Sequence, residues 1–235
     1  MLDVHIINMD RSPGKWKRCS SRFREKGFRV FRQEGYDVRN LDLSGYRTGF
    51  QKMGALGCNL SHRALWEKLL KSNRDFLIVA EDDAVPLVSS QVFTDQIRKL
   101  PKEIDFVHFG CGTRCKERPF IGAHCYLVTR NGARKYFAHW TNRIDVAVDK
   151  AIGDTPGVNL MRVKPELATF ETLRATDSDI IHTANPLAAM LDNVPFDENR
   201  TLGYVMFYPG YYDLNLFHLF VVLIFFTLLF VKYKK

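Results

Sequence analysis

Three acidic residues, Glu81, Asp82 and Asp83, follow directly after the apolar run of residues 76–80. Carboxylates at the end of a buried strand lie at the carboxyl edge of a sheet, where open α/β sheets bind ligands. Hard cations such as Mg²⁺ and Mn²⁺ prefer these oxygens and often share them with substrate phosphates. Because residues two apart in an extended chain face the same way, Glu81 and Asp83 are candidates for one metal ion, whereas Asp82 points elsewhere. The alternative is a solvated acidic turn that caps the strand.

The segment from Arg11 to Arg32 is strongly basic. It contains nine lysines or arginines and one acid, Glu25. The net charge of this segment is therefore +8, which equals the net charge of the whole chain. A basic surface this concentrated predicts an anionic neighbour, for which nucleic acid, anionic lipid and the diphosphate of a nucleotide sugar are candidates. The ordinary alternative is a solvated helix face. A helix is expected here because Ser12 can cap it and Pro13 suits its first turn.

Apolar periodicity and turn residues predict alternating strands and helices that would position these groups. We expect strands near residues 4–8, 28–31, 76–80, 106–109 and 123–128. Besides the basic helix, we expect helices near 61–71 and 90–98, and a further one after Asn131-Gly132, a pair expected to break the chain. Strands separated by helices of this length indicate an α/β fold with a mainly parallel sheet flanked by helices.

Residues 214–231 form an apolar run whose only polar residues are Asn215, His218 and Thr227. About 18 residues at ~1.5 Å each span ~27 Å, close to the ~30 Å thickness of a hydrocarbon core. The lysines after the run and the tyrosines before it favour a transmembrane anchor over a buried core helix. We therefore expect a main domain over residues 1–182, an irregular segment and linker over 183–213, and an anchor with a lysine tail over 214–235.

The opening residues 1–8 read as a first strand rather than a signal peptide, because the apolar run is short and contains an acid and a histidine. We therefore expect a tail-anchored protein whose main domain lies in the cytosol. The 5 cysteines are odd in number and scattered, which is typical of a reducing compartment. Sequons at Asn59 and Asn199 would matter only if the domain were lumenal.

Several short motifs follow one another in an order that resembles glycosyltransferase family 25. The family includes lipooligosaccharide galactosyltransferases and collagen galactosyltransferases. The resemblance covers roughly residues 4–180, and no single motif carries it alone. The motifs are Ile6-Ile7-Asn8-Met9-Asp10-Arg11-Ser12-Pro13, Gly57-Cys58-Asn59-Leu60-Ser61-His62, the three acids at 81–83, residues 123–134, Ile144-Asp145 and Ser178-Asp179-Ile180.

The resemblance implies a single-domain transferase of the GT-A type that moves a hexose, galactose or glucose, from a UDP-sugar to a glycan, glycolipid or protein acceptor. It implies that Mn²⁺ or Mg²⁺, held by Glu81 and Asp83, contacts the diphosphate of the donor. Family members of known stereochemistry invert the anomeric centre, which requires a carboxylate base. Asp145 is our candidate for the base, with Asp149 as the alternative. The resemblance places five residues at the donor: Asn8, Asp10, Arg11, His62 and Asp82.

Two positions depart from the pattern of the family: Ala55 stands where glutamate is usual, and Met9 where leucine is usual. Ala55 leaves open a catalytically inactive transferase fold that serves as a scaffold. A membrane-anchored protein that binds nucleic acid would explain the basic segment but not the acidic strand end, so no nucleic-acid partner is expected. A metal-dependent phosphohydrolase is a further alternative that the acids alone would permit.

Overall fold

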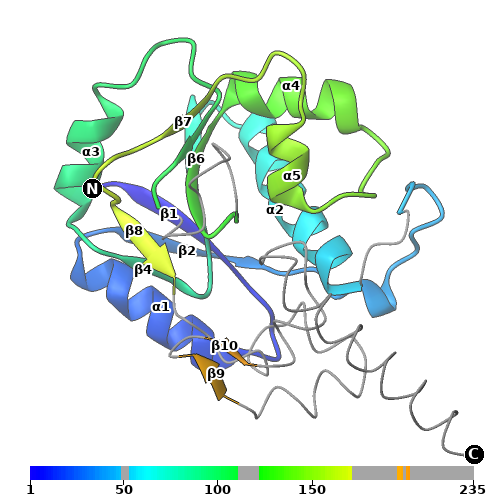
Figure 1. Ribbon diagram of the computed structural model, residues 1–235, viewed down its shortest axis with the longest axis horizontal. Helices are drawn as coiled ribbons and strands as arrows, with labels where there is room; N and C mark the ends of the chain where they lie inside the picture. The colour runs from blue at the N-terminus through cyan, green and yellow to red at the C-terminus, as the bar shows by residue number, and fades with distance from the viewer. Residues whose placement is uncertain (49–52, 111–121, 171–194, 198–199, 202–235) are drawn as a thin grey trace, which may run out of the picture. The chain divides into compact units, whose positions relative to one another are not determined.

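A six-stranded sheet lies at the centre of the unit formed by Met1–Glu171 (Figure 1), with the strand order β2-β1-β3-β6-β5-β7. The computed structural model describes residues 1–48, 53–110, 122–170, 195–197 and 200–201. The chain forms two compact units, Met1–Glu171 and Thr172–Lys235, and the sheet belongs to the first. The strands are β1 (Asp3–Asn8), β2 (Arg29–Glu34), β3 (Phe76–Glu81), β5 (Phe106–His108), β6 (Cys125–Thr129) and β7 (Leu160–Arg162).

Helices α1 (Pro13–Glu25) and α3 (Ser90–Ile97) cover one face of the sheet, on the left in Figure 1. Phe23 of α1 and Phe93 of α3 are completely buried against Ile6 of β1 and other strand residues. Ser12 stands at the N-cap position of α1 and Pro13 begins the helix, but the Ser12 side chain makes no capping hydrogen bond. The basic segment therefore forms a helix whose apolar side is core.

Helices α2 (Met53–Lys71), α4 (Arg130–Trp140) and α5 (Val148–Gly153) cover the opposite face. Trp66 of α2, Tyr136 of α4 and Ile152 of α5 pack there with Val79 of β3, and all four are fully buried. Because neighbouring strand residues point to opposite faces, each central strand contributes to both cores. A short 3₁₀ helix, η1 (Val38–Asn40), also contacts α2.

The predicted α/β fold, with a mainly parallel sheet and helices on both faces, is confirmed, and one strand runs against the others. β1 is parallel to β2 and β3, and β5 is parallel to β7. β6 instead runs antiparallel to both of its neighbours, β3 and β5. A short buried apolar strand has the same sequence pattern in either direction, so periodicity could not reveal this reversal.

Two predicted helix boundaries were wrong. α2 begins at Met53 rather than near 61, and its early glycines lower the helix propensity that the prediction relied on. Gly57 is needed there because a Cβ atom would lie 2.4 Å from the Tyr36 carbonyl oxygen. Asn131-Gly132 does not break the chain but lies in the first turn of α4, where the Thr129 side chain accepts a hydrogen bond from the Gly132 amide.

A second, two-stranded sheet pairs β4 (Ala84–Pro86) with β8 (Ala168–Phe170) in antiparallel register. In the second unit, β9 (Pro195–Asp197) pairs with β10 (Arg200–Thr201), so these residues of the predicted irregular segment are strands. The described part of the chain contains no helix with the length and apolar character to cross a membrane. The expected anchor at 214–231 and the motif at 178–180 lie outside the described residues.

Candidate functional site

Glu81, Asp83 and His124 converge at the carboxyl end of β3. One ligand atom from each of the three lies within 4.8 Å of the other two. His124 Nδ1 is 3.4 Å from Glu81 Oε2 and 3.6 Å from Asp83 Oδ1. The three side chains are only 15–22% exposed. This burial argues against the solvated acidic turn.

Strand pairing and two neighbours fix the His124 ring. The Glu81 amide donates to the His124 carbonyl oxygen at 2.9 Å, because β6 begins beside the end of β3. Phe170 stacks on the ring with a centroid distance of 4.3 Å. Gly122 has a φ of +73°, and a Cβ atom there would lie 2.5 Å from His124 Nε2. Glycine at 122 therefore leaves the space that the imidazole occupies.

The electrostatics of this group favour a positive charge between the two carboxylates. Burial opposes a charged His124, but Asp83 and Glu81 nevertheless raise its pKa to about 10. Burial would raise the pKa of Glu81, yet contacts with His124 and His62 lower it below its ordinary value. Without a metal, the imidazolium of His124 supplies the positive charge.

The donor set of this group fits a divalent cation. Asp83 Oδ1 and His124 Nδ1 are buried, and apart from the ion-pair contacts at 3.4 and 3.6 Å they make no hydrogen bond within the described ranges. Buried polar atoms of this kind are normally satisfied by a hydrogen bond, water or ion. Two carboxylates and one imidazole suit Mn²⁺ or Mg²⁺, provided that the imidazole is neutral when it binds. Glu81, Asp83 and His124 could therefore hold the expected ion.

A buried chain of hydrogen bonds supports Glu81 from behind. Trp66 Nε1 donates to the Tyr126 hydroxyl at 2.9 Å, and that hydroxyl is 2.7 Å from His62 Nδ1. His62 Nε2 is 3.1 Å from Glu81 Oε1. If His62 carries its proton on Nε2, it donates to Glu81, and its Nδ1 accepts a hydrogen bond from the Tyr126 hydroxyl. Every hydrogen bond is then donated in the direction from Trp66 to Glu81. Such support restricts the orientation of a metal-binding carboxylate.

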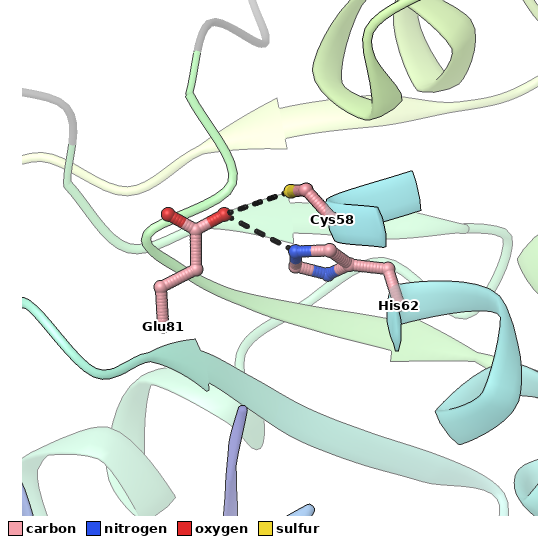
Figure 2. Close-up of side chains that lie close together, drawn as sticks. All are labelled: Cys58, His62 and Glu81. Atoms are coloured by element: carbon pink, nitrogen blue, oxygen red, sulfur yellow. Dashed lines mark hydrogen bonds and ion pairs between the residues drawn. The ribbon is translucent and has the colours of Figure 1, made fainter. Parts of the chain in front are cut away.

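The helix expected near 61–71 would place His62 in its first turn. In the structure His62 instead lies in the interior of α2, where it is completely buried. Figure 2 shows His62 and Cys58 on α2, both directed at one oxygen of Glu81. Cys58 Sγ lies 3.7 Å from Glu81 Oε1. Burial and the Glu81 charge raise the pKa of Cys58 well above its ordinary value, so the free side chain is a thiol.

Three of the residues expected at the donor gather beside this group. The Asn8 amide donates to Asp82 Oδ2 at 2.6 Å, and Asn8 Oδ1 accepts from Arg32 at 2.9 and 3.1 Å. Arg32 also pairs with Asp10 at 2.7 Å. Asp82 thus points toward β1, away from the Glu81 group, as the alternation of side chains predicts. The ends of β1, β2 and β3 are joined by these contacts.

Arg11 and Asp145, two further predicted site residues, have ion pairs of their own. Arg11 lies 2.8 Å from Asp37. Asp145 lies 3.1 Å from Arg47 and 3.3 Å from Arg143, and its side chain is 10% exposed. The described contacts do not join either residue directly to Glu81 or Asp83.

α2 also holds the loop that carries Asp145. The Asn59 amide donates to the Val146 carbonyl at 3.1 Å, and its oxygen accepts from Tyr136. Asn59 is completely buried in a helix, so its sequon cannot carry a glycan in this fold. Arg63 is also buried and donates to three carbonyl oxygens, those of Trp140, Thr141 and Arg143.

Sequence reasoning missed His124, Cys58 and Tyr126 as members of this site. All three belong to motifs that we had quoted, but without a role for these residues. The approach of His124 to Glu81 and of Tyr126 to His62 could be predicted only with the direction of β6 known. Cys58 precedes His62 by four residues on α2, and the expected helix start near 61 left it outside the helix.

Residues 1–117 match the model of a family described as Glycosyltransferase family 25 (LPS biosynthesis protein). These are 117 of the 235 residues, so just under half of the chain is similar to glycosyltransferase family 25. The match covers less of the chain than the expected range of roughly 4–180. The acidic group at 81–83 and the segment 57–62 of α2 lie inside the family 25 match.

Two relatives named "Glycosyltransferase 25 family member" give alignments 95 residues long, which cover 34% of this chain. The protein from Aedes aegypti is 32% identical there and that from Anopheles gambiae 28%. The aligned region is 16% of the length of each relative, so the chain corresponds to a small part of these family 25 proteins.

Two solved glycosyltransferases are among the structures to which this chain is similar. One is involved in the glycosylation of the major capsid of PBCV-1, with 9% identity, a TM-score of 0.45, and coverage of 77% of this chain and 96% of the other. The galactosyltransferase LgtC, in complex with donor and acceptor sugar analogs, gives 9% identity, a TM-score of 0.47, and coverage of 74% and 88%.

Proposed function

We propose that this protein is a metal-dependent, inverting glycosyltransferase of the GT-A type. It transfers a hexose, galactose or glucose, from a UDP-sugar to a glycan, glycolipid or protein acceptor. The observation that carries the proposal is the convergence of Glu81, Asp83 and His124 at the end of β3. Ligands of α/β sheets bind at this edge, and the two acids lie inside the family 25 match.

Glu81, Asp83 and His124 hold the divalent ion in this proposal. When bound, Mn²⁺ or Mg²⁺ neutralises the charge that develops on the departing nucleotide diphosphate. His62 and Tyr126 keep Glu81 Oε1 in place, so that the carboxylate does not reorient during turnover.

The donor lies next to this group, along the ends of β1 and β3. Asn8 and Asp10 both contact the Arg32 guanidinium and fix its position. These contacts support a role for Arg32 in placing a positive charge beside the diphosphate of the donor. Asp82 and Arg11 complete the proposed donor side. Each of these residues except Asp82 comes from the basic segment or its immediate border.

Asp145 acts as the base. Its carboxylate takes the proton of the acceptor hydroxyl while that oxygen attacks the anomeric carbon of the donor, and the nucleotide diphosphate leaves. Arg47 and Arg143 hold the side chain in one orientation. Asp149 is the alternative base, and it has one relevant contact: its carboxylate accepts from the Gly122 amide, two residues before His124.

The test is a panel of nucleotide sugars with Mn²⁺, in which release of the nucleotide diphosphate is measured with and without candidate acceptors. We expect release from UDP-galactose or UDP-glucose that stops when EDTA is added. If the folded protein binds the nucleotide but releases nothing from any donor, the inactive scaffold that Ala55 leaves open is the better account.

We also propose that residues 214–231 anchor the protein in a membrane, with the catalytic domain in the cytosol. The apolar run and its lysine tail support the anchor, and the free thiols of Cys19, Cys58 and Cys125 agree with a reducing compartment. Protease added to sealed membranes should digest the domain. Protection of the domain, or a glycan on Asn199, would contradict this orientation; Asn59 cannot serve as the reporter because it is buried.

A further inference from the structure

A second group of possible metal ligands lies on the other side of Glu81. Cys58 and His62 are four residues apart on α2, so their side chains lie on the same face of the helix. Both reach Glu81 Oε1, with Sγ at 3.7 Å and Nε2 at 3.1 Å. One ligand atom from each of the three residues lies within 4.8 Å of the others.

The two oxygens of Glu81 face different partners. Oε1 faces Cys58 and His62, whereas Oε2 faces His124. Figure 2 shows the second oxygen directed away from the Cys58–His62 pair. A carboxylate in this orientation can bind one ion through each oxygen, so the two groups do not compete for the same atom.

We propose that Cys58, His62 and Glu81 form a second metal site, for a thiophilic divalent ion of the Zn²⁺ type. A sulfur, an imidazole nitrogen and a carboxylate oxygen form a softer donor set than the two carboxylates and imidazole of the first group. The two sites therefore differ in metal selectivity: Zn²⁺ or Co²⁺ binds at Cys58, and Mn²⁺ or Mg²⁺ binds beside Asp83. The proposal does not depend on sugar transfer.

Binding changes the protons of two ligands in a balanced way. The ion replaces the thiol proton of Cys58, which passes to solvent, and a sulfur–metal bond forms. His62 stays neutral but changes tautomer: its Nε2 proton passes to solvent and Nδ1 takes up a proton in its place, so that Nε2 offers its lone pair to the ion. The Tyr126 oxygen, 2.7 Å from Nδ1, then accepts that proton in a hydrogen bond, the kind of support that metal-binding histidines usually have.

The same three residues would make an ordinary hydrogen-bonded cluster if both Cys58 and His62 only donated to Glu81. Spectroscopy with Co²⁺ distinguishes the two accounts, because only a thiolate ligand gives a sulfur-to-cobalt charge-transfer band. The purified full chain is titrated with Co²⁺ alone and then with Zn²⁺ as a competitor. We expect the band to appear and to be displaced by Zn²⁺, but not by an equal concentration of Mg²⁺.

Two variants complete the test. Cys58→Ser should abolish the band and lower the Zn²⁺ affinity at least about 10-fold. Asp83→Asn removes a ligand of the first group only, so it should retain the band even though it loses Mn²⁺-dependent turnover. Absence of the band in the folded wild-type protein, or its persistence in Cys58→Ser, would overturn the second site. Turnover of Asp83→Asn is measured separately from the cobalt band. Failure of the transferase proposal can therefore be distinguished from failure of the second metal site.

Discussion

His124 Nδ1 lies 3.4 Å from Glu81 Oε2 because β6 runs antiparallel to β3, so that the first residues of one strand meet the last residues of the other. In a parallel pairing, the start of β6 would lie at the opposite edge of the sheet from Glu81. The strand reversal therefore supplies the nitrogen ligand of the candidate metal group. It also places Tyr126 where it can contact His62.

Replacement of Tyr126 by phenylalanine should weaken the support of Glu81 without removing any metal ligand. The change leaves Trp66 Nε1 and His62 Nδ1 without their shared partner, which should cost about 1–3 kcal/mol of unfolding free energy. We expect the concentration of Mn²⁺ needed for half-maximal activity to rise about 10- to 100-fold. If Tyr126→Phe lowers the unfolding free energy but leaves the Mn²⁺ concentration for half-maximal activity unchanged, the role of Tyr126 is in packing alone.

Replacement of Arg63 by methionine should destabilise the loop that carries Asp145. It leaves three carbonyl oxygens at the end of α4 without their donor, at a cost of about 2–4 kcal/mol. Arg134→Met on the exposed side of α4 is the matched control, with an expected change within about 0.5 kcal/mol. Urea unfolding measures both, and equal stabilities for the two variants would contradict this bracing role.

Acid should destabilise the fold through His5. Burial, with a contribution from Arg74, lowers the pKa of His5 to about 4. Because the unfolded state binds the proton more readily, stability is complete above the ordinary histidine pKa and is lost as the pH falls toward 4. From about pH 7.5 to about pH 5, we expect a loss of about 1–2 kcal/mol after allowance for solvent screening.

His5→Gln should remove this part of the pH dependence, because glutamine does not titrate in the same range. His139→Gln, at an exposed position on α4, should leave it unchanged. Urea unfolding at several pH values gives the comparison. A pH profile that is identical in wild type and His5→Gln would assign the loss to other groups.

The layers of the fold could be predicted from the sequence, because residues 76–80 of β3 are a continuous apolar run, and neighbouring residues of a strand point to opposite faces, so both faces must be covered. The acids at the end of β3 could also be predicted, since the apolar run ends at Ala80. His124 could not, because its meeting with Glu81 depends on strand direction. The roles of Asn59 and Arg63 could not either, because their partners are backbone carbonyls of a distant loop.

Asp145→Asn should lower turnover by about 10²- to 10⁴-fold while donor binding changes little, since only proton transfer is removed. Asp149→Asn is the comparison, because Asp149 is the alternative base and contacts the Gly122 amide. Single-turnover kinetics and donor titration separate the two effects. If Asp149→Asn shows the selective loss of turnover and Asp145→Asn does not, the base is Asp149.

Asp83→Asn tests the central claim most directly. The amide has nearly the same shape as the carboxylate but lacks the charge that holds a cation, and it removes one of two closely spaced negative groups. The fold should therefore persist. Asp95→Asn is the control, because Asp95 is 48% exposed on α3. In the described structure its contacts are a hydrogen bond from Gln91 and an ion pair with Arg98 at the end of the same helix, away from Glu81 and Asp83.

The measurement is Mn²⁺-dependent release of UDP from the preferred UDP-sugar, with the thermal unfolding midpoint recorded for each variant. We predict that Asp83→Asn loses more than about 100-fold of the metal-dependent rate, whereas Asp95→Asn and the unfolding midpoints of both variants stay close to wild type. Full Mn²⁺-dependent activity in folded Asp83→Asn would contradict the account of the metal site at the end of β3.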